Sequence, residues 1–345
     1  MFTSILLATG VLAAAEPAPM MSAKEAPVSR ARVVITEDAE ATSAFVPQAA
    51  AVGRLFRSGL RHWTGKDSDR AAWLRLIKPS DVVGIKVHSA PGEIIGTRPL
   101  LVAAIVESLI NAGFKPDQIV VWDKFRSHLR LAGFFELQQK YGVRVEGSSE
   151  FGWDESAHYE NSLVGKPVWG DLEFGRSGGE IGRKSYYSRL VTREIKRHIV
   201  VVPLLNHNVA GVAGGLMSLA LGSVDNSIRF ETRPAAMAEA VPEIFGRPEI
   251  FDHLALVVVD ALLCQYQGEE NSRLHYSKSL NQLRFSNDPV ALDVLSLHEL
   301  EAQREAAGLP ARIFPRDLYR NAELLQLGVA DPRRLLVERA PFAAP

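Results

Sequence analysis

The sequence has 345 residues, of which 47% are hydrophobic, with 39 basic and 40 acidic side chains and a formal net charge of −1. This is the composition of a globular protein with enough apolar material for a sizeable core. Because there is no excess of positive charge for phosphate contacts, no nucleic-acid partner is expected. The single cysteine, Cys264, excludes an internal disulfide and a cysteine-ligated iron–sulfur cluster. Its apolar surroundings predict a buried, unreactive thiol.

The N-terminal segment has the pattern of an export signal. Residues 5–15 form an apolar run that ends in three alanines, although no Lys or Arg precedes it. A run of this length with a small-residue end is typical of a secretory signal peptide, cleaved here after Ala15. It is too short to span a bilayer, so no integral membrane segment is expected after cleavage. Residues 16–30, rich in Pro, Ala and Ser, predict a flexible tether. The protein is therefore expected to be periplasmic or extracellular, a disordered N-terminus being the alternative.

Strand and helix patterns alternate along the rest of the chain. Strands are expected at residues 31–35, 81–87, 119–123, 143–145, 198–203, 254–259 and 283–286. Helices are expected at residues 45–63, 68–77, 98–112, 129–141, 289–307 and 315–327. The apolar strands suit a sheet covered on both faces, and the strand–helix–strand order predicts parallel crossovers. We therefore expect residues 31–345 to form a single α/β domain with a doubly wound, mostly parallel sheet and an irregular, glycine-rich insertion at about 147–188.

Polar residues follow five of the expected strands. They are Lys86 and His88, Asp123, the run Asn206, His207 and Asn208, then Asp260, and finally Asn287. Ligands of open parallel sheets bind beyond the carboxyl ends of the strands, so these residues are candidates for a site. Each also has a structural alternative. Lys86 and His88 can bind an anion or a metal, or be an extended lysine and a hydrogen-bonded histidine. Asp123 and Asp260 can be metal ligands or general bases, or can cap the following turn.

The segment 203–226 is the densest of these candidates. The polar run 206–208 precedes a glycine-rich stretch, 210–216, that opens a short helix ending near Leu221. Such an arrangement can direct backbone N–H groups at an anion, although it matches neither G-x-G-x-x-G nor the P-loop. The ligand-binding candidates here are Asn206, Asn208, Gly211, Gly214, Gly215, Asp225 and Asn226. Farther on, Asp288 is placed to cap a helix, whereas Asp293 lies within the apolar start of that helix and needs a partner.

Several of these segments share their order with a known family. They are Val83–Val87 ending near Lys86, residues 97–99, residues 202–207, the run 210–216 followed by 222–226, residues 257–260 and residues 287–293. Together they cover about 81–300 and resemble the domain-of-unknown-function family numbered 362 (DUF 362). The resemblance implies an α/β fold, often exported in bacteria and sometimes joined to iron–sulfur modules, which the cysteine count does not support here. A Thr, a Lys and an Asn of the family pattern are replaced by Ala213, Met217 and Ser218, leaving Lys86 as the family-like base or anion clamp.

Two functions of different classes follow from these patterns. The first is a metal-dependent enzyme acting on a small anionic substrate, with Asp123, Asp260 and Asp293 as ligands of a divalent metal and with Lys86 and His207 as catalytic groups. The alternative is a periplasmic small-ligand binding or accessory protein that has lost the Lys and Thr of the family pattern. A structural member of an envelope assembly is a third possibility. Oligomeric state, metal and ligand identity are left open by the sequence.

Overall fold

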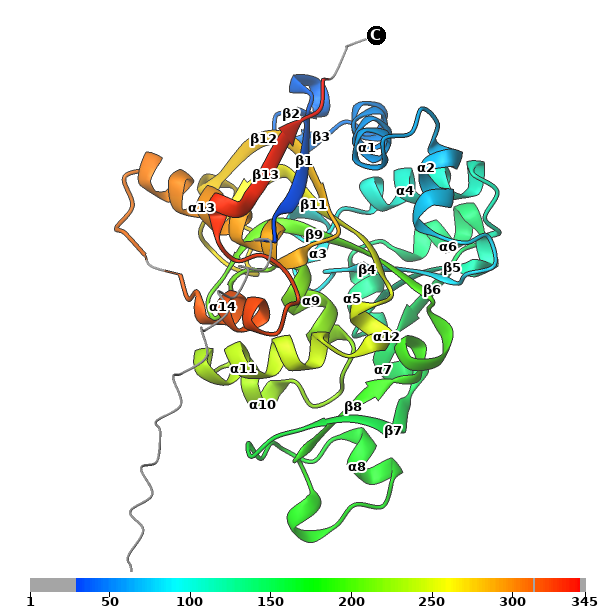
Figure 1. The fold of residues 1–345 in the computed structure, drawn as a ribbon, viewed down its shortest axis with the longest axis vertical. Helices are drawn as coiled ribbons and strands as arrows, with labels where there is room; N and C mark the ends of the chain where they lie inside the picture. The colour runs from blue at the N-terminus through cyan, green and yellow to red at the C-terminus, as the bar shows by residue number, and fades with distance from the viewer. Residues whose placement is uncertain (1–28, 313, 342–345) are drawn as a thin grey trace, which may run out of the picture.

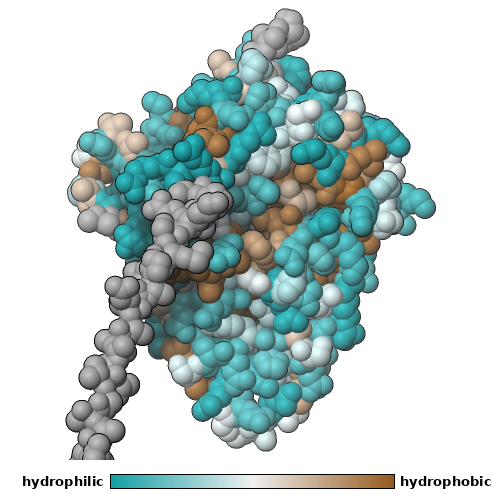
Figure 2. Space-filling model, viewed as in Figure 1, coloured by the Kyte–Doolittle hydropathy of each residue, from teal (hydrophilic) through white to brown (hydrophobic). Residues whose placement is uncertain are grey.

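The computed structural model describes residues 29–312 and 314–341 (Figure 1). The expected signal peptide, residues 1–15, and most of the expected tether, residues 16–30, lie outside the described residues. Of the helices within the described ranges, none is long and apolar enough to cross a membrane. Hydrophilic residues cover most of the face shown in Figure 2, and a hydrophobic band crosses the middle of that face.

A single large sheet forms the centre of the fold. Its strands follow the order β13 (Leu335–Arg339), β1 (Ala31–Glu37), β12 (Ser277–Ser286), β11 (Leu254–Gln265), β9 (Arg197–His207), β4 (Val83–Val87), β5 (Ile119–Asp123) and β6 (Arg144–Gly147). β12 runs antiparallel to both of its neighbours, whereas the other pairs along this order are parallel. The short strand β10 (Gly211–Val212) folds back along the end of β9. The expected α/β fold with a mostly parallel sheet is confirmed.

Helices cover both faces of the sheet (Figure 1). One face packs against α1 (Ala49–Thr64), α2 (Asp69–Leu76), α4 (Pro99–Asn111) and α6 (Phe135–Tyr141). The other packs against α9 (Gly215–Gly222), α11 (Pro234–Phe245), α13 (Pro289–Ala306) and α14 (Asp317–Leu324). Successive residues of a strand point to opposite faces, so Val200 and Val201 belong to different hydrophobic cores. Because both faces of the sheet are buried, the strands have continuous apolar runs rather than alternating polar and apolar residues.

Residues 148–188 form a separate substructure beside the carboxyl end of β6 (lower part of Figure 1). It consists of α7 (Ser148–Phe151), the antiparallel pair β7 (Trp153–Glu160) and β8 (Lys184–Ser188), and α8 (Trp169–Glu173) between those strands. Asn226 fastens it to the core, since its amide donates to the carbonyls of Gly182 and Lys184 at 3.1 and 3.3 Å. The buried Arg229 adds a bond to the carbonyl of Leu163 at 2.7 Å.

Short elements complete the described chain. They are the 3-10 turn Ala39–Ala41, the hairpin β2 (Thr42–Ser43) and β3 (Val46–Pro47), α3 (Gly92–Ile95), α5 (Arg126–Leu131), α10 (Ile228–Glu231), α12 (Pro248–Phe251), and four further single turns at Pro116–Gln118, Gly178–Glu180, Leu274–Tyr276 and Pro332–Arg334, with a π turn at Leu190–Glu194.

Three local expectations differ from the structure. The helix expected at 129–141 is divided into α5 and α6, because Gly133 takes a φ of 81° between them. The helix expected from residue 45 begins at Ala49, since Phe45 lies in the turn of the β2–β3 hairpin. Most important for function, β12 is antiparallel to β11, so its carboxyl end lies at the opposite edge of the sheet from the ends of β4, β5 and β9.

Candidate functional site

Lys86 and Asp123 meet at the carboxyl ends of the neighbouring parallel strands β4 and β5. The Lys86 ammonium donates to Oδ1 of Asp123 at 2.7 Å, to the carbonyl of Val87 at 2.6 Å and to Oγ of Ser218 on α9 at 3.0 Å. The other Asp123 oxygen accepts from the backbone N–H and the hydroxyl of Ser89 at 2.8 and 2.6 Å. We call Lys86, Ser89, Asp123 and Ser218 the Lys86 cluster. It joins two strands of the sheet to the helix that covers them.

The surroundings of Lys86 enclose its side chain completely. The side chain passes Gly222, where a Cβ would overlap Cε of the lysine, and its ammonium lies 5.5 Å from the centre of the Trp122 ring. Burial lowers the pKa of Lys86, an effect that Asp123 opposes. Burial acts to raise the pKa of Asp123, but the charges of Lys86 and His88 and the hydrogen bonds from Lys86 and Ser89 together outweigh it and bring this pKa to about 2. An ammonium has three N–H donors, and here three protein acceptors use them, so Lys86 is held as a structural cation rather than an open catalytic base.

His88 and His207 lie beside this cluster. Burial lowers the pKa of His88 to about 4, and the charges of Asp123, Lys86 and His207 also act on it. Its Nε2 is buried and has no hydrogen-bond partner within residues 29–312 and 314–341. Nδ1 of His207 accepts the backbone N–H groups of Val209 and Ala210 at 3.2 and 3.1 Å. His207 is therefore first of all the residue that orders the turn between β9 and β10.

The other two predicted metal ligands have partners elsewhere. Asp260, fully buried on β11, forms an ion pair with Arg98 at the start of α4, with 2.7 Å between Oδ1 and Nη1. Asp293 accepts the backbone N–H groups of Gly215 and Leu216 at 2.8 and 3.1 Å, which caps the beginning of α9. The Lys86 cluster contacts the middle of the same helix through Ser218. Asp123, Asp260 and Asp293 thus do not share one site.

This arrangement bears directly on the expected metal. Each of the three carboxylates is committed to a cation or to backbone N–H groups. Within the described ranges, no group of three or more His, Cys, Asp or Glu side chains is placed to hold a metal ion. The residues present therefore do not fit the divalent site that the strand ends suggested. Asp293 is an example: the packing of α13 against α9 places its carboxyl group at a helix N-terminus, so it is not available to a metal.

The glycine-rich segment does not present free N–H groups to an anion. The first N–H groups of α9 are already bound by Asp293, and a Cβ on Gly214 would overlap that carboxylate. Gly211 takes a φ of 86° and pairs with His207 in the β9–β10 turn. The interpretation of Gly211, Gly214 and Gly215 as ligand-binding residues is therefore corrected. Their small size permits close packing, and the protein itself supplies the carboxylate for the helix N-terminus.

The predicted asparagines are scattered. Asn206 is buried, and its Oδ1 accepts the backbone N–H of Glu269 at 3.1 Å. Asn208 is exposed, and its Oδ1 accepts from Arg312 at 2.8 Å. Asn287 is also exposed, but it follows β12 and lies at the opposite edge of the sheet. Asn226 fastens the 148–188 substructure, as described above. None of the four joins the Lys86 cluster by a hydrogen bond within the described ranges.

A cavity opens next to the Lys86 cluster, between the ends of β5 and β6 and the 148–188 substructure. Its volume is about 680 Å³, and Lys124, Trp153, Trp169, Arg189 and Asp225 are among the residues that line it. We call it the Lys124 cavity. Volumes of this size are ordinary for small-molecule sites. Asp225 is among the candidates from the sequence and Lys124 is not, although Lys124 directly follows Asp123 at a strand end and satisfies the same criterion.

Two ionisable groups of the cavity have displaced pKa values. Burial lowers the pKa of Lys124, and the carboxylates of Glu231 and Asp225 act in the opposite direction. The Lys124 ammonium donates to the hydroxyl of Ser227, which in turn donates to Glu231. Burial raises the pKa of Asp225 to about 6. Oδ1 of Asp225 accepts the N–H groups of Tyr186 and Asn226 at 2.8 and 2.6 Å, whereas its Oδ2 is buried without a partner within the described ranges.

Other charged groups of the cavity have hydrogen-bond or ion-pair partners within the protein. Glu150 accepts the backbone N–H of Arg126 at 3.3 Å from both of its oxygens. Glu173 faces the guanidinium of Arg189 at 3.8 Å. Lys124 is thus the cation of this cavity that is held by a neutral hydroxyl rather than by a direct carboxylate contact. The cavity therefore combines a half-buried ammonium, the Asp225 carboxyl group with its raised pKa, the Glu173–Arg189 pair, Glu150, and aromatic walls.

Comparison with known proteins adds little to this geometry. Among solved structures, the chain is similar to a Thermotoga maritima protein whose crystal structure comes from a structural genomics consortium, with 12% identity and a TM-score of 0.41. The similarity covers 76% of this chain and 62% of that one, so this chain spans less than two thirds of its length. No family model and no curated protein matches the sequence. The resemblance to the unknown-function family stays a prediction.

Proposed function

We propose that this protein binds a small anionic molecule in the Lys124 cavity. The observation that carries the proposal is the ammonium of Lys124, which lines a cavity of about 680 Å³ and has a neutral hydroxyl, Ser227, as its hydrogen-bond acceptor. A partly desolvated ammonium that donates one of three N–H groups to the protein can offer the others to a carboxylate or phosphate. Arg189, which faces Glu173, also lines the cavity. Trp153 and Trp169 offer apolar contacts for the body of the ligand.

Binding is better supported than catalysis. Lys86, the expected catalytic lysine, is buried and uses its three donors on protein acceptors. The expected metal ligands have separate partners. Where the resemblance implies a second lysine, Met217 is packed in the hydrophobic core. The Lys124 cavity needs none of these groups to hold an anion, so a small-ligand binding or accessory role follows most directly from the contacts.

The exchange Lys124→Met should weaken anion binding at least about tenfold, because a charge-assisted hydrogen bond at a desolvated site contributes on the order of 1.5–3 kcal/mol.

Anion binding should also depend on pH through Asp225. Burial raises the pKa of Asp225 to about 6, so anion affinity should rise as the pH falls through that value and the repelling carboxylate is protonated. A thermal-shift panel of phosphate, simple carboxylates and sugar acids would identify a ligand, and calorimetry would then give its affinity.

Lys66→Met, at an exposed position before α2, is the matched control and should leave affinity unchanged. Equal affinity for Lys124→Met and the unmodified protein would contradict the proposal. Turnover of a bound ligand that disappears in His207→Ala, with binding retained, would instead support an enzyme.

Export belongs to the same proposal, and the support for it is the apolar run 5–15 with its three terminal alanines. When the full chain is expressed in a bacterium with a periplasm, cleavage after Ala15 should give a mature protein that begins at Glu16. Mass spectrometry of the periplasmic fraction measures this directly. Replacing Ala13 and Ala15 by bulky leucines should leave the uncleaved chain. Full-length protein found only in the cytoplasm would contradict export without affecting the ligand proposal.

A further inference from the structure

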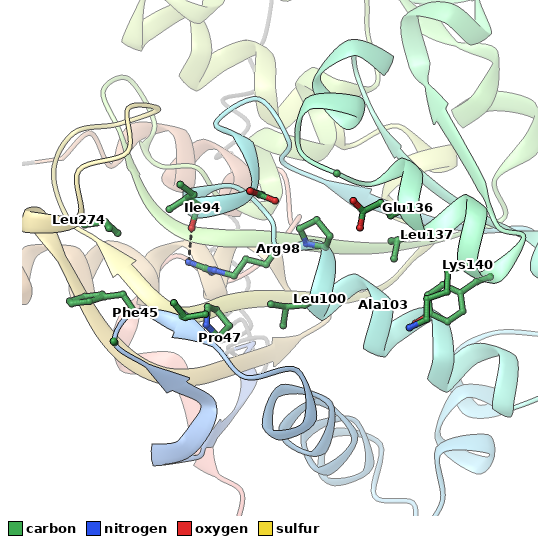
Figure 3. Close-up of a pocket in the computed structure, with 16 residues that line it drawn as sticks. Phe45, Pro47, Ile94, Arg98, Leu100, Ala103, Glu136, Leu137, Lys140 and Leu274 are labelled. Atoms are coloured by element: carbon green, nitrogen blue, oxygen red, sulfur yellow. Dashed lines mark hydrogen bonds between the residues drawn. The ribbon is translucent and has the colours of Figure 1, made fainter.

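A second cavity, which shares no lining residue with the Lys124 cavity, has mainly apolar walls (Figure 3). It has a volume of about 670 Å³ and is bounded by the β2–β3 hairpin, α3, the beginning of α4, α6 and Leu274. We call it the Phe45 groove. Figure 3 shows Phe45, Pro47 and Leu274 at one end, Lys140 at the other, and Leu100 and Ala103 along α4 between them. Its volume is within the range of small-molecule sites.

Large apolar side chains stay exposed around this groove. Phe45, Val46, Ile94 and Leu274 are each more than 40% exposed, although they come from three separate parts of the chain. Exposed apolar residues that gather in one concave place indicate a binding surface, whereas single ones do not. The groove therefore offers a contiguous apolar wall that the other described residues leave exposed.

The hairpin that carries Phe45 has an unusual backbone. Ala44 and Phe45 take φ values of 47° and 63°, a conformation that L residues with a Cβ adopt rarely and that such a turn usually assigns to Asn or Gly. The turn thus holds a large aromatic residue at the mouth of the groove in an unfavourable conformation. Backbone strain of this kind is concentrated at ligand sites, where a side chain must be presented.

The two cations that line the groove have carboxylate partners outside the lining, whereas its two carboxylates have no ion-pair partner among the described residues. Of its two cations, Arg98 is paired with the buried Asp260 at 2.7 Å, and Lys140 faces Glu107 at 3.6 Å and lies over the ring of Tyr141. The remaining charged residues that line the groove are Glu93 and Glu136.

These two carboxylates belong to the same wall. Oε2 of Glu93 lies 3.9 Å from the position that a Cβ on Gly133 would occupy, three residues before Glu136. Figure 3 shows the Glu136 side chain on the α6 side of the groove, above the apolar residues of α4. A ligand that complements this wall carries a positive charge next to an apolar body.

We propose that the Phe45 groove binds a small lipophilic amine. The apolar body of the amine lies between Phe45, Leu100 and Leu274. The ammonium of the amine interacts with Glu93 and Glu136. Arg98 lines the groove with its charge neutralised by Asp260, and its guanidinium also donates to the carbonyl of Ile94 at 3.1 Å. This site is separate from the Lys124 cavity and of opposite charge preference, so either proposal can fail without the other.

Three probes of matched shape test the proposal by calorimetry: 4-phenylbutylamine, 4-phenylbutan-1-ol and 4-phenylbutyrate. The unmodified protein should bind the amine about tenfold more tightly than the alcohol, and the acid most weakly, because only the amine makes charge-assisted hydrogen bonds to carboxylates. In Glu136→Gln and Glu93→Gln the preference for the amine over the alcohol should fall to about threefold or less, with affinity for the alcohol retained. In Phe45→Ala all three probes should weaken.

The controls are Glu239→Gln, an exposed carboxylate on α11, and Leu324→Ala, an exposed leucine on α14, which should both bind like the unmodified protein. Lys124→Met should also leave amine binding intact. Three outcomes would overturn the proposal: no binding of any probe, tightest binding of the acid, or an amine preference that both glutamine variants retain. A dimer that dissociates in Phe45→Ala, measured by analytical ultracentrifugation, would overturn it too, since a second copy would then occupy the groove.

Discussion

Replacing Lys86 by methionine should lower the free energy of unfolding by about 3–5 kcal/mol, because it leaves the Asp123 carboxylate buried without its cation. Methionine keeps most of the side-chain volume beside Gly222 and Trp122, so the expected loss comes from the charge and its hydrogen bonds rather than from a cavity. Urea unfolding followed by tryptophan fluorescence and far-UV circular dichroism measures the change. A catalytic lysine would instead lose activity with little loss of stability.

The double variant Lys86→Met/Asp123→Asn separates these explanations. Removing both charges should restore at least about half of the stability lost in Lys86→Met, since the unpaired buried charge is gone. Lys278→Met, at an exposed position on β12, is the matched control and should change stability by less than about 0.5 kcal/mol. If Lys86→Met unfolds at the same urea concentration as the unmodified protein, the Lys86 cluster is not a structural ion pair, and Lys86 returns as a candidate for ligand contact.

Raising the pH should weaken the fold through Asp293. Burial raises the pKa of this carboxyl group from its ordinary 3.8 to about 7, although two N–H groups of α9 act in the opposite direction. The folded state therefore holds the proton more tightly than the unfolded state. The resulting stability is fully present below about pH 4 and is lost as the pH rises to 7, by up to about 4 kcal/mol at 1.36 kcal/mol per pKa unit.

The comparison with Asp293→Asn isolates this contribution. Other groups titrate in the same range: burial raises the pKa of Asp225 and Asp288 to about 6, and lowers that of His88 to about 4 with the opposite effect on stability. The difference in unfolding free energy between the unmodified protein and Asp293→Asn should therefore be measured, and it should decrease from pH 4 to pH 7.5. For Asp252→Asn, an exposed position, the corresponding difference should stay flat. A difference that increases with pH would mean that the start of α9 holds Asp293 ionised.

Much of the element order was predictable because local patterns carry it. The strand expected at 119–123 is observed with the same bounds, and the long helix expected at 98–112 appears as Pro99–Asn111. These segments combine a continuous apolar run or helical spacing with clear boundaries, such as Pro99 at the first turn and Gly113 after the last. By contrast, α11 and β13 were missed. β13 pairs with β1 alone at the edge of the sheet and is partly exposed, so its apolar pattern is weak.

Sequence reasoning predicted part of the convergence of the candidate residues. Lys86 and Asp123 do converge, because β4 and β5 are parallel neighbours and Lys86 pairs in register with Trp122, one residue before Asp123. Asn287 was placed with them by the same criterion, which fails for a strand that runs the other way. Strand direction depends on which strands become neighbours, and the local pattern of 283–286 contains no such information.

The sequence by itself determined the fold class, the polar ends of the strands and the polar composition of the segment 203–226. Its residues fix these features through apolar periodicity and turn chemistry, which act over a few neighbours. Only the tertiary structure decided which charge meets which. Asp123 pairs with Lys86, Asp260 pairs with Arg98, and Asp293 caps the N-terminus of α9. Lys124 lines a cavity, and Glu136 lies on an apolar wall. A buried polar or charged group needs a partner because burial without one is costly, and residues far apart in the chain supply that partner only after the chain has packed.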